Sequence, residues 1–176
     1  MSIVIRPAVA SDLDAIRLIY AHHVQHGTGS FETEPPDHAE MTRRWSEVEA
    51  RGLPWLVAED SGDIGGYAYA APYRARPAYR HTVEDSIYVR ADRLGTGLGK
   101  LLMPALITAV QACGMRQMIA VIGDSANEPS ITLHRRFGFQ DAGLLKEVGF
   151  KFGRWLDTVF MQRSLLQDPF NEGRKL

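Results

Sequence analysis

Short apolar runs and helical patterns follow one another along the chain. Residues 2–6 form a β-branched run that a proline ends, which predicts a strand. Residues 11–20 then offer a capping side chain, followed by leucine, isoleucine and tyrosine at helical spacing. Residues 27–36 combine two glycines with two prolines and show no helical period, so we expect a loop. Asp37 can cap a second helix that reaches about residue 50.

The middle of the chain predicts three strands. Residues 55–58 and 65–70 are apolar runs on either side of a polar turn at residues 60–63, so we expect a hairpin. A segment rich in Arg, Tyr and Pro at residues 73–80 leads into residues 82–89, where aliphatic and aromatic positions predict a third strand. Polar residues interrupt this otherwise buried strand.

The C-terminal half begins with a helical pattern and ends in strands. Apolar residues at helical spacing predict a helix from about residue 98 to Cys113, which Gly114 ends. After it we expect a strand at 118–122, a short helix at 130–136, and strands near 144–151 and 157–162. Because strands and helices intermix without regular alternation, we expect an α/β (α+β) fold in which helices flank a mixed sheet. We expect one domain over residues 1–166 and a frayed tail at residues 167–176.

Composition and charge narrow the class of protein. Of the 176 residues, 45% are hydrophobic and 23% are charged, as in an ordinary globular protein. A balance of 20 basic against 21 acidic side chains gives a net charge of -1, which argues against a broad surface for nucleic acid. Cys113 is the only cysteine, so no internal disulfide can form and a cytoplasmic location fits. We find neither an apolar leader nor about eighteen consecutive apolar residues, and therefore expect neither export nor a membrane span.

Three histidines lie close together in the first predicted helix. His22, His23 and His26 include a pair at helical spacing that could hold a metal ion. No third ligand or glutamate completes a zinc motif, so we expect no metal.

A glycine-rich segment, Arg93-Leu94-Gly95-Thr96-Gly97-Leu98-Gly99-Lys100, separates the strand at 82–89 from the next helix. A turn of this kind leaves backbone N–H groups free at a helix N-terminus, where the helix dipole favours an anion. Glycine also lets the backbone approach a pyrophosphate without a Cβ in the way. The spacing G-x-G-x-G fits neither the dinucleotide fingerprint nor the phosphate loop of nucleoside triphosphatases. Taken alone, the segment predicts a phosphate-binding turn, with a plain glycine turn as the alternative.

Several further segments accompany this turn. They are Phe31-Glu32-Thr33-Glu34-Pro35, Arg74-Ala75-Arg76-Pro77-Ala78-Tyr79, Thr82-Val83-Glu84-Asp85-Ser86-Ile87-Tyr88-Val89, Ala120-Val121-Ile122-Gly123, Ser130-Ile131-Thr132-Leu133-His134 and Gly149-Phe150-Lys151-Phe152-Gly153-Arg154-Trp155-Leu156-Asp157. From about Ile3 to Arg163 the chain resembles the phosphinothricin and methionine sulfoximine N-acetyltransferase branch of the Gcn5-related N-acetyltransferase (GNAT) superfamily. That superfamily has Gln or Arg where this chain has Leu94. The substitution affects a side-chain contact to the ligand more than the binding by backbone amides. The resemblance implies a mostly antiparallel sheet of about seven strands, splayed between strands 4 and 5. It also implies a homodimer.

Acetyl-CoA is the cosubstrate that the resemblance implies. Its pyrophosphate would lie on the turn made by Gly95, Thr96, Gly97, Leu98, Gly99 and Lys100, and its pantetheine arm along Ile87, Tyr88 and Val89. Asn127 would contact the pantetheine, and Ser130 would serve the thiolate side. In the alternative interpretation these two residues cap a helix, and capping could coexist with binding.

Glu84 is the candidate general base. The resemblance brings it near the thioester, where a glutamate could take the proton of an attacking amine directly or through a water. A surface or paired carboxylate is the alternative. Asp85 points to the opposite face of the same strand and is interpreted as structural. Asp85 and Ser86 are also candidate substrate contacts.

The implied acceptor is a small amino acid whose side chain ends in a tetrahedral polar head. Arg74, Arg76 and Tyr79 could bind its oxygens, with a solvated basic loop as the alternative. Phe31 could form an apolar wall over it or be a core aromatic. The resemblance places His134 near the acceptor. In the alternative interpretation it is a helix histidine whose hydrogen bonds are satisfied within the protein.

The chain is therefore predicted to transfer an acetyl group from acetyl-CoA to the α-amino group of L-methionine sulfoximine, methionine sulfone or phosphinothricin by direct attack. One alternative keeps this chemistry and changes the amine to another amino acid, a polyamine or a protein N-terminus. The other is a non-catalytic acyl-CoA sensor.

Overall fold

The computed structural model describes residues 3–166, so the tail expected at residues 167–176 lies outside the described residues. Its strands and main helices follow in this order: β1 (Ile3–Pro7), α1 (Leu13–His26), α2 (His38–Ala50), β2 (Trp55–Asp60), β3 (Asp63–Pro72), β4 (Thr82–Val89), α3 (Leu98–Ala112), β5 (Gln117–Gly123), α4 (Glu128–Arg136), β6 (Gln140–Lys151) and β7 (Arg154–Ser164). Short 3-10 helices cover Ala10–Asp12, Pro77–Tyr79 and Ala91–Arg93. Each strand and helix that the sequence predicts is present.

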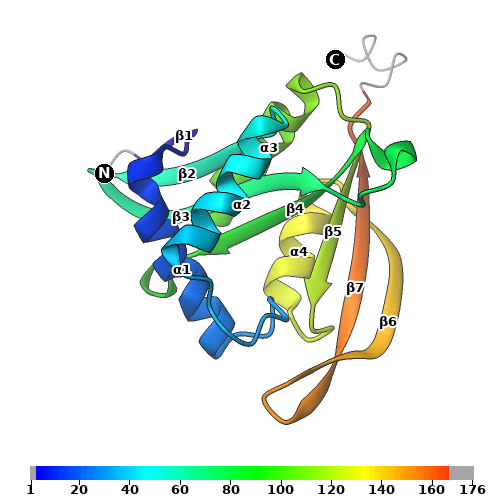
Figure 1. Ribbon diagram of the computed structural model, residues 1–176. Coiled ribbons are helices and arrows are strands. Elements are labelled where there is room, and N and C mark those ends of the chain that lie inside the picture. The colour runs from blue at the N-terminus through cyan, green and yellow to red at the C-terminus, as the bar shows by residue number, and fades with distance from the viewer. Residues whose placement is uncertain (1–2, 167–176) are drawn as a thin grey trace, which may run out of the picture.

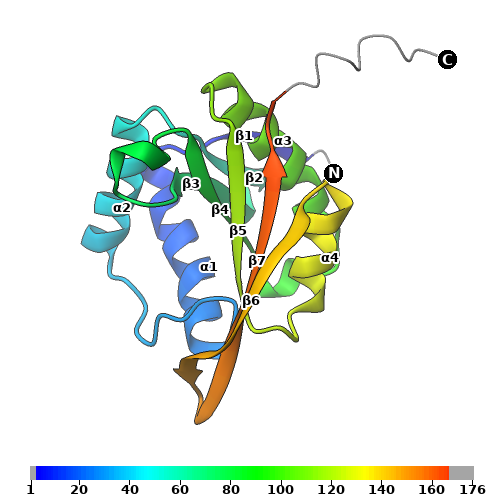
Figure 2. The same ribbon diagram turned by 90° about the vertical axis from the view of Figure 1, so that its right-hand side faces the viewer.

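The strands form one seven-stranded sheet in the order β1-β2-β3-β4-β5-β7-β6. Neighbouring strands are antiparallel except β4 and β5, which run parallel. Helices α1 and α2 cover one face of the sheet, and α3 and α4 cover the other (Figure 1 and Figure 2). The predicted mixed sheet flanked by helices is confirmed.

Strands β4 and β5 are paired over only part of their length. Their register pairs run from Thr82 opposite Gln117 to Asp85 opposite Ala120. Beyond that point β4 stays paired with β3, and β5 stays paired with β7. The sheet therefore opens between β4 and β5, in agreement with the predicted splay.

Burial on both faces fixes β4 in the middle of the sheet. On one face, Leu102, Leu106 and Val110 of α3 recur at helical spacing and are fully buried. On the other face, α1 buries Ile16 and Tyr20. Because the strand is held between these two layers, its side chains have little freedom to move away from the positions that strand alternation gives them.

Local side-chain chemistry sets the ends of several helices. Asp37 caps α2, because its Oδ1 accepts a hydrogen bond from the Glu40 amide at 2.8 Å. Gly114 takes a left-handed conformation with φ 73° after α3, which confirms the predicted stop. Helix α1 begins without the expected side-chain cap, because the Asp12 carboxylate instead accepts hydrogen bonds from the Val9 amide and from an arginine on β1.

The hairpin of β6 and β7 is longer than the sequence predicts. Strand β6 begins at Gln140 and β7 ends at Ser164, beyond the expected ranges. Strand β6 is the edge of the sheet, and most of its side chains are exposed, so no alternation of apolar and polar residues marks its start. Exposed large apolar side chains on this hairpin include Phe150, Phe152 and Trp155.

Candidate functional site

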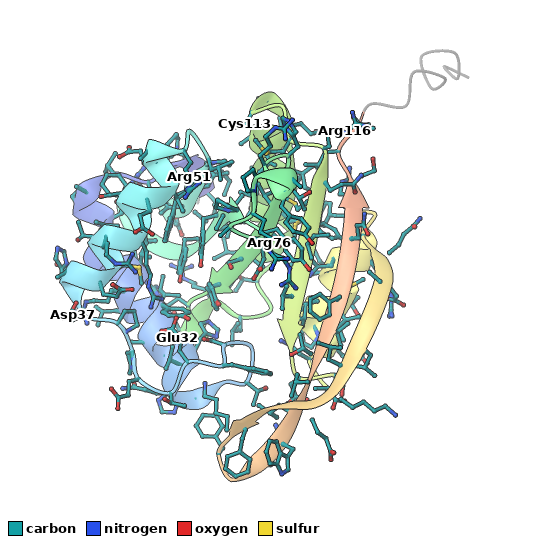
Figure 3. The ribbon with its side chains drawn as sticks, turned by 45° about the vertical axis from the view of Figure 1, so that its right-hand side comes forward. Glu32, Asp37, Arg51, Arg76, Cys113 and Arg116 are labelled. Carbon is teal, nitrogen blue, oxygen red and sulfur yellow. The ribbon has the colours of Figure 1, made fainter. Side chains whose placement is uncertain are left out.

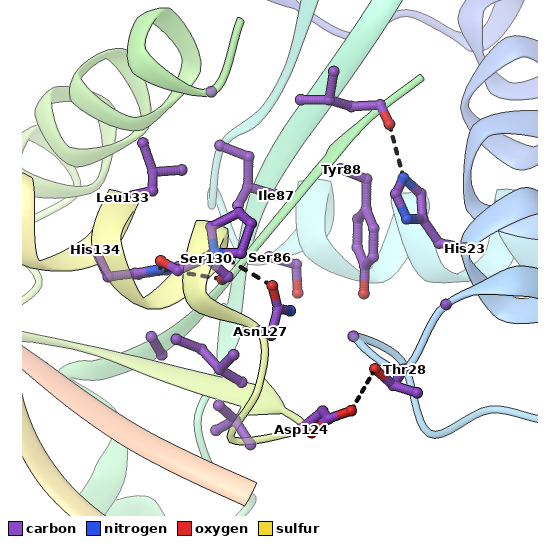
Figure 4. Close-up of a pocket in the computed structure, with 18 of the residues that line it drawn as sticks. His23, Thr28, Ser86, Ile87, Tyr88, Asp124, Asn127, Ser130, Leu133 and His134 are labelled. Carbon is purple, nitrogen blue, oxygen red and sulfur yellow. Dashed lines mark hydrogen bonds between the residues drawn. The ribbon is translucent and has the colours of Figure 1, made fainter. Parts of the chain in front are cut away.

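A cavity of about 480 Å³ lies where β4 and β5 separate (Figure 4). Its walls come from the ends of these two strands, the start of α4, the start of α3 and the loop after α1. The residues predicted from the sequence that line it are Asp85, Ser86, Ile87, Tyr88, Val89, Gly99, Asn127, Ser130 and His134. The fold thus gathers residues from three separate segments of the chain at the opening in the sheet.

The glycine turn lies beside this cavity, where Leu94 and Gly99 contribute to the wall. Gly97 is the N-cap of α3 and has φ 93°, in the left-handed region that favours glycine. The backbone amides of Gly97, Leu98 and Gly99 donate to no backbone oxygen among residues 3–166. Free N–H groups at a helix N-terminus are the arrangement that binds phosphates and other anions.

The other predicted residues of the turn lie outside the cavity wall. Gly95 also has a positive φ, of 76°. The Thr96 hydroxyl donates to the Arg93 carbonyl at 2.6 Å, and the Lys100 amide donates to the Gly97 carbonyl at 2.9 Å. These bonds hold the turn in shape and leave the earlier amides of the helix free.

The last residues of β4 form the floor of the cavity. Because they have no partner on β5, alternate N–H and C=O groups of residues 86–89 point into the opening. His23 on α1 also lines the cavity, with its Nε2 atom 2.8 Å from the Val89 carbonyl oxygen. Because a carbonyl oxygen can only accept, Nε2 donates this hydrogen bond, and burial lowers the pKa of the His23 ring. No local pattern predicts this contact, because it joins residues 66 positions apart.

The start of α4 forms the opposite wall. The Asn127 side chain caps the helix, since its Oδ1 accepts a hydrogen bond from the Ser130 amide at 3.4 Å. Both residues also line the cavity. Capping and a place in the cavity wall therefore coexist.

Asp85 and His134 form a buried pair in the same wall. Their side chains are 1% and 3% exposed, and His134 Nε2 lies 2.9 Å from Asp85 Oδ2. The other ring nitrogen, Nδ1, lies 2.7 Å from the Ser130 carbonyl oxygen, which can only accept a hydrogen bond. Burial works to lower the pKa of His134, but the hydrogen bond and the negative charge of Asp85 raise it overall. His134 is thus both a satisfied helix histidine and part of the cavity wall.

Glu84 lies on the opposite face of β4 from Asp85, as strand alternation predicts. It shares that face with Tyr88, whose ring lies 5.0 Å from the ring of Tyr20 on α1. Burial and then the nearby Asp85 carboxylate raise the pKa of Glu84 to about 7, while Arg74 acts in the opposite direction. A carboxyl group with such a pKa can both accept and release a proton near neutral pH, as a general base must.

The loop after α1 borders the cavity near the ends of β5 and β6. The Thr28 hydroxyl donates to Asp124 Oδ2 at 3.0 Å, and both residues line the cavity. Lys151 anchors the loop, because its buried Nζ donates to the Gly27 carbonyl at 2.9 Å and to the Ser30 carbonyl at 2.8 Å. Sequence reasoning missed these residues as parts of the site, because contacts across 96 to 124 positions leave no local pattern.

Phe31 follows on this loop but does not line the cavity. Its ring packs on β5 and β6, where an added Cβ at Gly123 or at Gly149 would clash with the ring. Two glycines thus make room for this ring. The side chain keeps an exposed fraction of 38%, so it is not a core aromatic.

The predicted acceptor residues lie around two smaller cavities. Arg74 lines both, a cavity of about 330 Å³ beside α2 and β3 and an adjoining one of about 380 Å³, and Arg76 lines the second. Tyr79 lines neither, and its ring packs edge-on against Tyr73 at 5.7 Å. The structure therefore brings Arg74 and Arg76 together and leaves Tyr79 outside the cavities.

Two other expectations concern metal ions and membranes. Within residues 3–166, no group of three His, Cys, Asp or Glu side chains is arranged to hold a metal ion. In that same part of the chain, no helix has both the length and the apolar character needed to cross a membrane.

Known proteins resemble this chain over most of its length. A family model described as an acetyltransferase (GNAT) domain matches residues 5–160. The phosphinothricin N-acetyltransferase of Alcaligenes faecalis is 55% identical over 154 residues, which make up 88% of this chain and 78% of that protein. The L-methionine sulfoximine/L-methionine sulfone acetyltransferase of Pseudomonas aeruginosa is 45% identical over 171 residues, or 96% of this chain and 97% of that protein.

Solved structures share the fold as well. The crystal structure of a GNAT superfamily phosphinothricin acetyltransferase from Sinorhizobium meliloti in complex with acetyl-CoA has a TM-score of 0.90 at 49% identity, and the match covers 93% of this chain and 89% of that one. A putative acetyltransferase from Salmonella typhimurium with its cofactor acetyl-CoA has a TM-score of 0.92 at 37% identity, covering 95% of this chain and 96% of that one.

Proposed function

Because this chain belongs to the GNAT acetyltransferase family, we propose that it transfers the acetyl group of acetyl-CoA to the α-amino group of a small amino acid such as phosphinothricin, L-methionine sulfoximine or L-methionine sulfone. The observation that carries this proposal is the position of Glu84. This residue precedes by one the point where β4 and β5 separate, and its pKa is raised to about 7. The names of relatives that match nearly the whole chain support the acceptor class.

The residues around the opening fit acetyl-CoA. The free amides of Gly97, Leu98 and Gly99 suit its pyrophosphate. Backbone groups at residues 86–89 that have no strand partner on β5, apart from the Val89 carbonyl that His23 contacts, can bond the pantetheine amides in the manner of an added strand. Leu94 offers this cosubstrate an apolar surface in place of a polar contact.

The proposed reaction is a direct attack of the amine on the thioester. Glu84 takes a proton from the acceptor's ammonium group, which leaves a neutral amine with a free electron pair. A C–N bond forms at the thioester carbonyl carbon, and free amides of β4 are the donors available to the oxygen that becomes negative. The C–S bond then breaks, the nitrogen loses its second proton, and CoA leaves as a thiolate that takes up one proton. The products are therefore an amide, a free thiol and the proton that Glu84 returns to solvent. The Ser130 hydroxyl, on the α4 wall of the cavity, is the candidate donor to this sulfur.

The acceptor is proposed to lie on the Glu84 face of the sheet. Ser86 follows Glu84 on that face, and Arg74 is close enough to affect the Glu84 pKa. Both are candidate acceptor contacts. Phe31, Arg76, Tyr79, Asp85 and His134 remain predictions as acceptor contacts, with Asp85 and His134 on the cosubstrate side of β4.

The proposal includes a homodimer and a cytoplasmic location. Exposed aromatic side chains at Phe150, Phe152 and Trp155 on the β6–β7 hairpin support an interface between two copies. The cytoplasmic location is supported by the lack of a second cysteine in the sequence.

A thiol-release assay tests the proposed function. The purified protein is mixed with acetyl-CoA and, in separate reactions, with phosphinothricin, methionine sulfoximine, methionine sulfone, glutamate, spermidine or a short peptide with a free N-terminus. We expect the first three to accelerate CoA release most. If only spermidine or the peptide accelerated CoA release, the protein would still be an acetyltransferase, but the proposed acceptor would be wrong. If no amine accelerated release while acetyl-CoA still bound, a non-catalytic sensor would be the better description.

A further inference from the structure

Two arginines beside the acceptor face have no carboxylate partner. Arg51 is the C-cap residue of α2, and Arg74 follows β3. Among residues 3–166 neither forms an ion pair, whereas Arg43 and Arg44 on α2 each contact glutamates. Arg74 contacts only the neighbouring Tyr73, whose hydroxyl lies 3.5 Å away and whose ring centre lies 5.0 Å from the guanidinium carbon. Both guanidinium groups are therefore free to bind an anion.

These two arginines stand where the smaller cavities meet. Arg51 and Arg74 line both cavities, which also share Pro72 and Ala75. Volumes of about 330 and 380 Å³ lie in the range of small-molecule sites. Figure 3 shows Arg51 near the end of α2 and Arg76, which lines only the second cavity, farther toward the middle of the molecule.

The other charged side chains of the first cavity are already neutralised. Arg44 contacts Glu32 and Glu40, each at 2.7 Å. Glu47 is held by its neighbour Arg43. The positive charge that this cavity offers to a ligand therefore comes from its two unpaired arginines.

The first cavity adjoins the candidate general base. One of its lining residues, Ala71, lies directly opposite Glu84 in the pairing of β3 and β4. Side chains paired in this way on an antiparallel sheet have Cβ atoms about 5 Å apart. Tyr69 and Trp55, whose rings stack at 4.1 Å, form an apolar wall of the cavity. An amino acid with its amine at Glu84 can extend its side chain along this wall toward the arginines.

We propose that Arg51, together with Arg74, binds the side-chain head of the acceptor and selects amino acids whose head carries a negative charge. This inference rests on the proposed function. Phosphinothricin ends in an anionic phosphinate, whereas the sulfone of methionine sulfone is neutral but similar in shape. A guanidinium group binds two oxygens of one anion in a planar fork, and the attraction is stronger when those oxygens carry a charge.

The test is the ratio of kcat/KM for phosphinothricin to kcat/KM for methionine sulfone. We expect the ratio to exceed one in the wild type and to fall about tenfold in Arg51→Gln, as for loss of one charge-assisted hydrogen bond. Arg51→Lys keeps the charge and should retain part of the preference. Arg116→Gln is the matched control, because Arg116 is exposed and lines none of the three cavities. Melting curves of each variant show whether it is folded.

The result has two distinct ways to fail. An unchanged ratio in folded Arg51→Gln, or the same fall in Arg116→Gln, would overturn the assignment of Arg51. A wild type that acetylates neither amino acid would instead overturn the proposed function. Raising the salt concentration should lower the ratio in the wild type more than in Arg51→Gln, because salt screens the charge that the variant lacks.

Discussion

At the scale of single residues, two neighbouring carboxylates occupy opposite environments. Asp85 is buried against His134 on the face of α3 and α4, whereas Glu84 faces α1 and α2 with its pKa raised to about 7. Strand alternation is enough to predict that the two point in opposite directions. The sequence could not identify the partner of Asp85, because His134 follows 49 positions later.

The ionisation of Glu84 should appear in the pH dependence of catalysis. Only the ionised carboxylate can accept a proton, so kcat/KM for the acceptor is expected to rise with pH through a pKa near 7. In Glu84→Gln we expect this step to vanish and kcat/KM to fall about 100-fold or more, with acetyl-CoA binding kept. Steady-state rates at varied pH, with Glu49→Gln as a control on an exposed glutamate, measure both effects. A step that persists unchanged in Glu84→Gln would exclude this residue as the base.

The same side chain should cost stability at neutral pH. Its pKa is raised from an ordinary value of 4.5 to about 7 in the folded state, so the folded protein binds more protons than the unfolded chain between those values. Stability from this group is therefore present at low pH and falls as pH rises through that window. Glu84→Gln is expected to be more stable than the wild type at pH 8 by at most about 3 kcal/mol, and similar to it at pH 4. Denaturant titrations at the two pH values decide this, and an equal difference at both would contradict it.

At the scale of elements, the local sequence pattern predicted the helices that pack on the core but not the full extent of the edge strand β6. The apolar spacing of α3 and the capping of α2 by Asp37 follow from nearby residues alone. The first residues of β6 carry no such pattern, because an edge strand exposes both kinds of side chain. The segment after Gly114 was predicted as a strand, but its partial pairing with β4 depends on the whole sheet.

The proposed role of the turn before α3 in binding acetyl-CoA can be tested by a glycine-to-alanine substitution. Gly97→Ala places a Cβ on a residue with φ 93°, which strains the turn and moves its free amides. We expect the KM for acetyl-CoA to rise about tenfold while the KM for the acceptor changes little. Gly62→Ala is the control, because Gly62 has φ 87° and equal space around it but lies in the β2–β3 turn. If both variants changed the KM for acetyl-CoA alike, general strain and not the position of the amides would be responsible.

At the scale of the whole molecule, the site is assembled from parts that are distant in sequence. His23 on α1, Thr28 in the following loop and Asp124 after β5 all line the main cavity. Without the resemblance, the sequence does not predict that Asn127 and β4 line the same cavity. Lys151, which ties the loop to β6, illustrates the limit, since a lysine in an edge strand is usually exposed.

The assembly state can be tested through the β6–β7 hairpin. Phe150 and Trp155 are 57% and 62% exposed, and their rings lie 5.0 Å apart. We expect the wild type to be a dimer by light scattering after size exclusion, and the double variant Phe150→Asp and Trp155→Asp to be a monomer, because charges in an apolar interface are costly. Leu18→Asp, on α1 with 60% exposure, is the control and should stay dimeric. A wild-type monomer, or a dimer that survives the double variant, would contradict this interface.

The opening of the sheet at β4 has a consequence for kinetic order. Helix α3 lies on one face of the sheet, and α1 and α2 lie on the other (Figure 2). Glu84 faces α1 and α2, because it alternates with Asp85 along β4. The two substrates can therefore approach from different sides, and neither obstructs the path of the other. The one thiol of the chain, Cys113, is hydrogen-bonded to the Gly52 and Ala109 carbonyls at the far end of α3, too remote to carry an acyl group. Double-reciprocal plots should intersect, as for a ternary complex of random order, and parallel lines would indicate a ping-pong scheme that this architecture does not provide for.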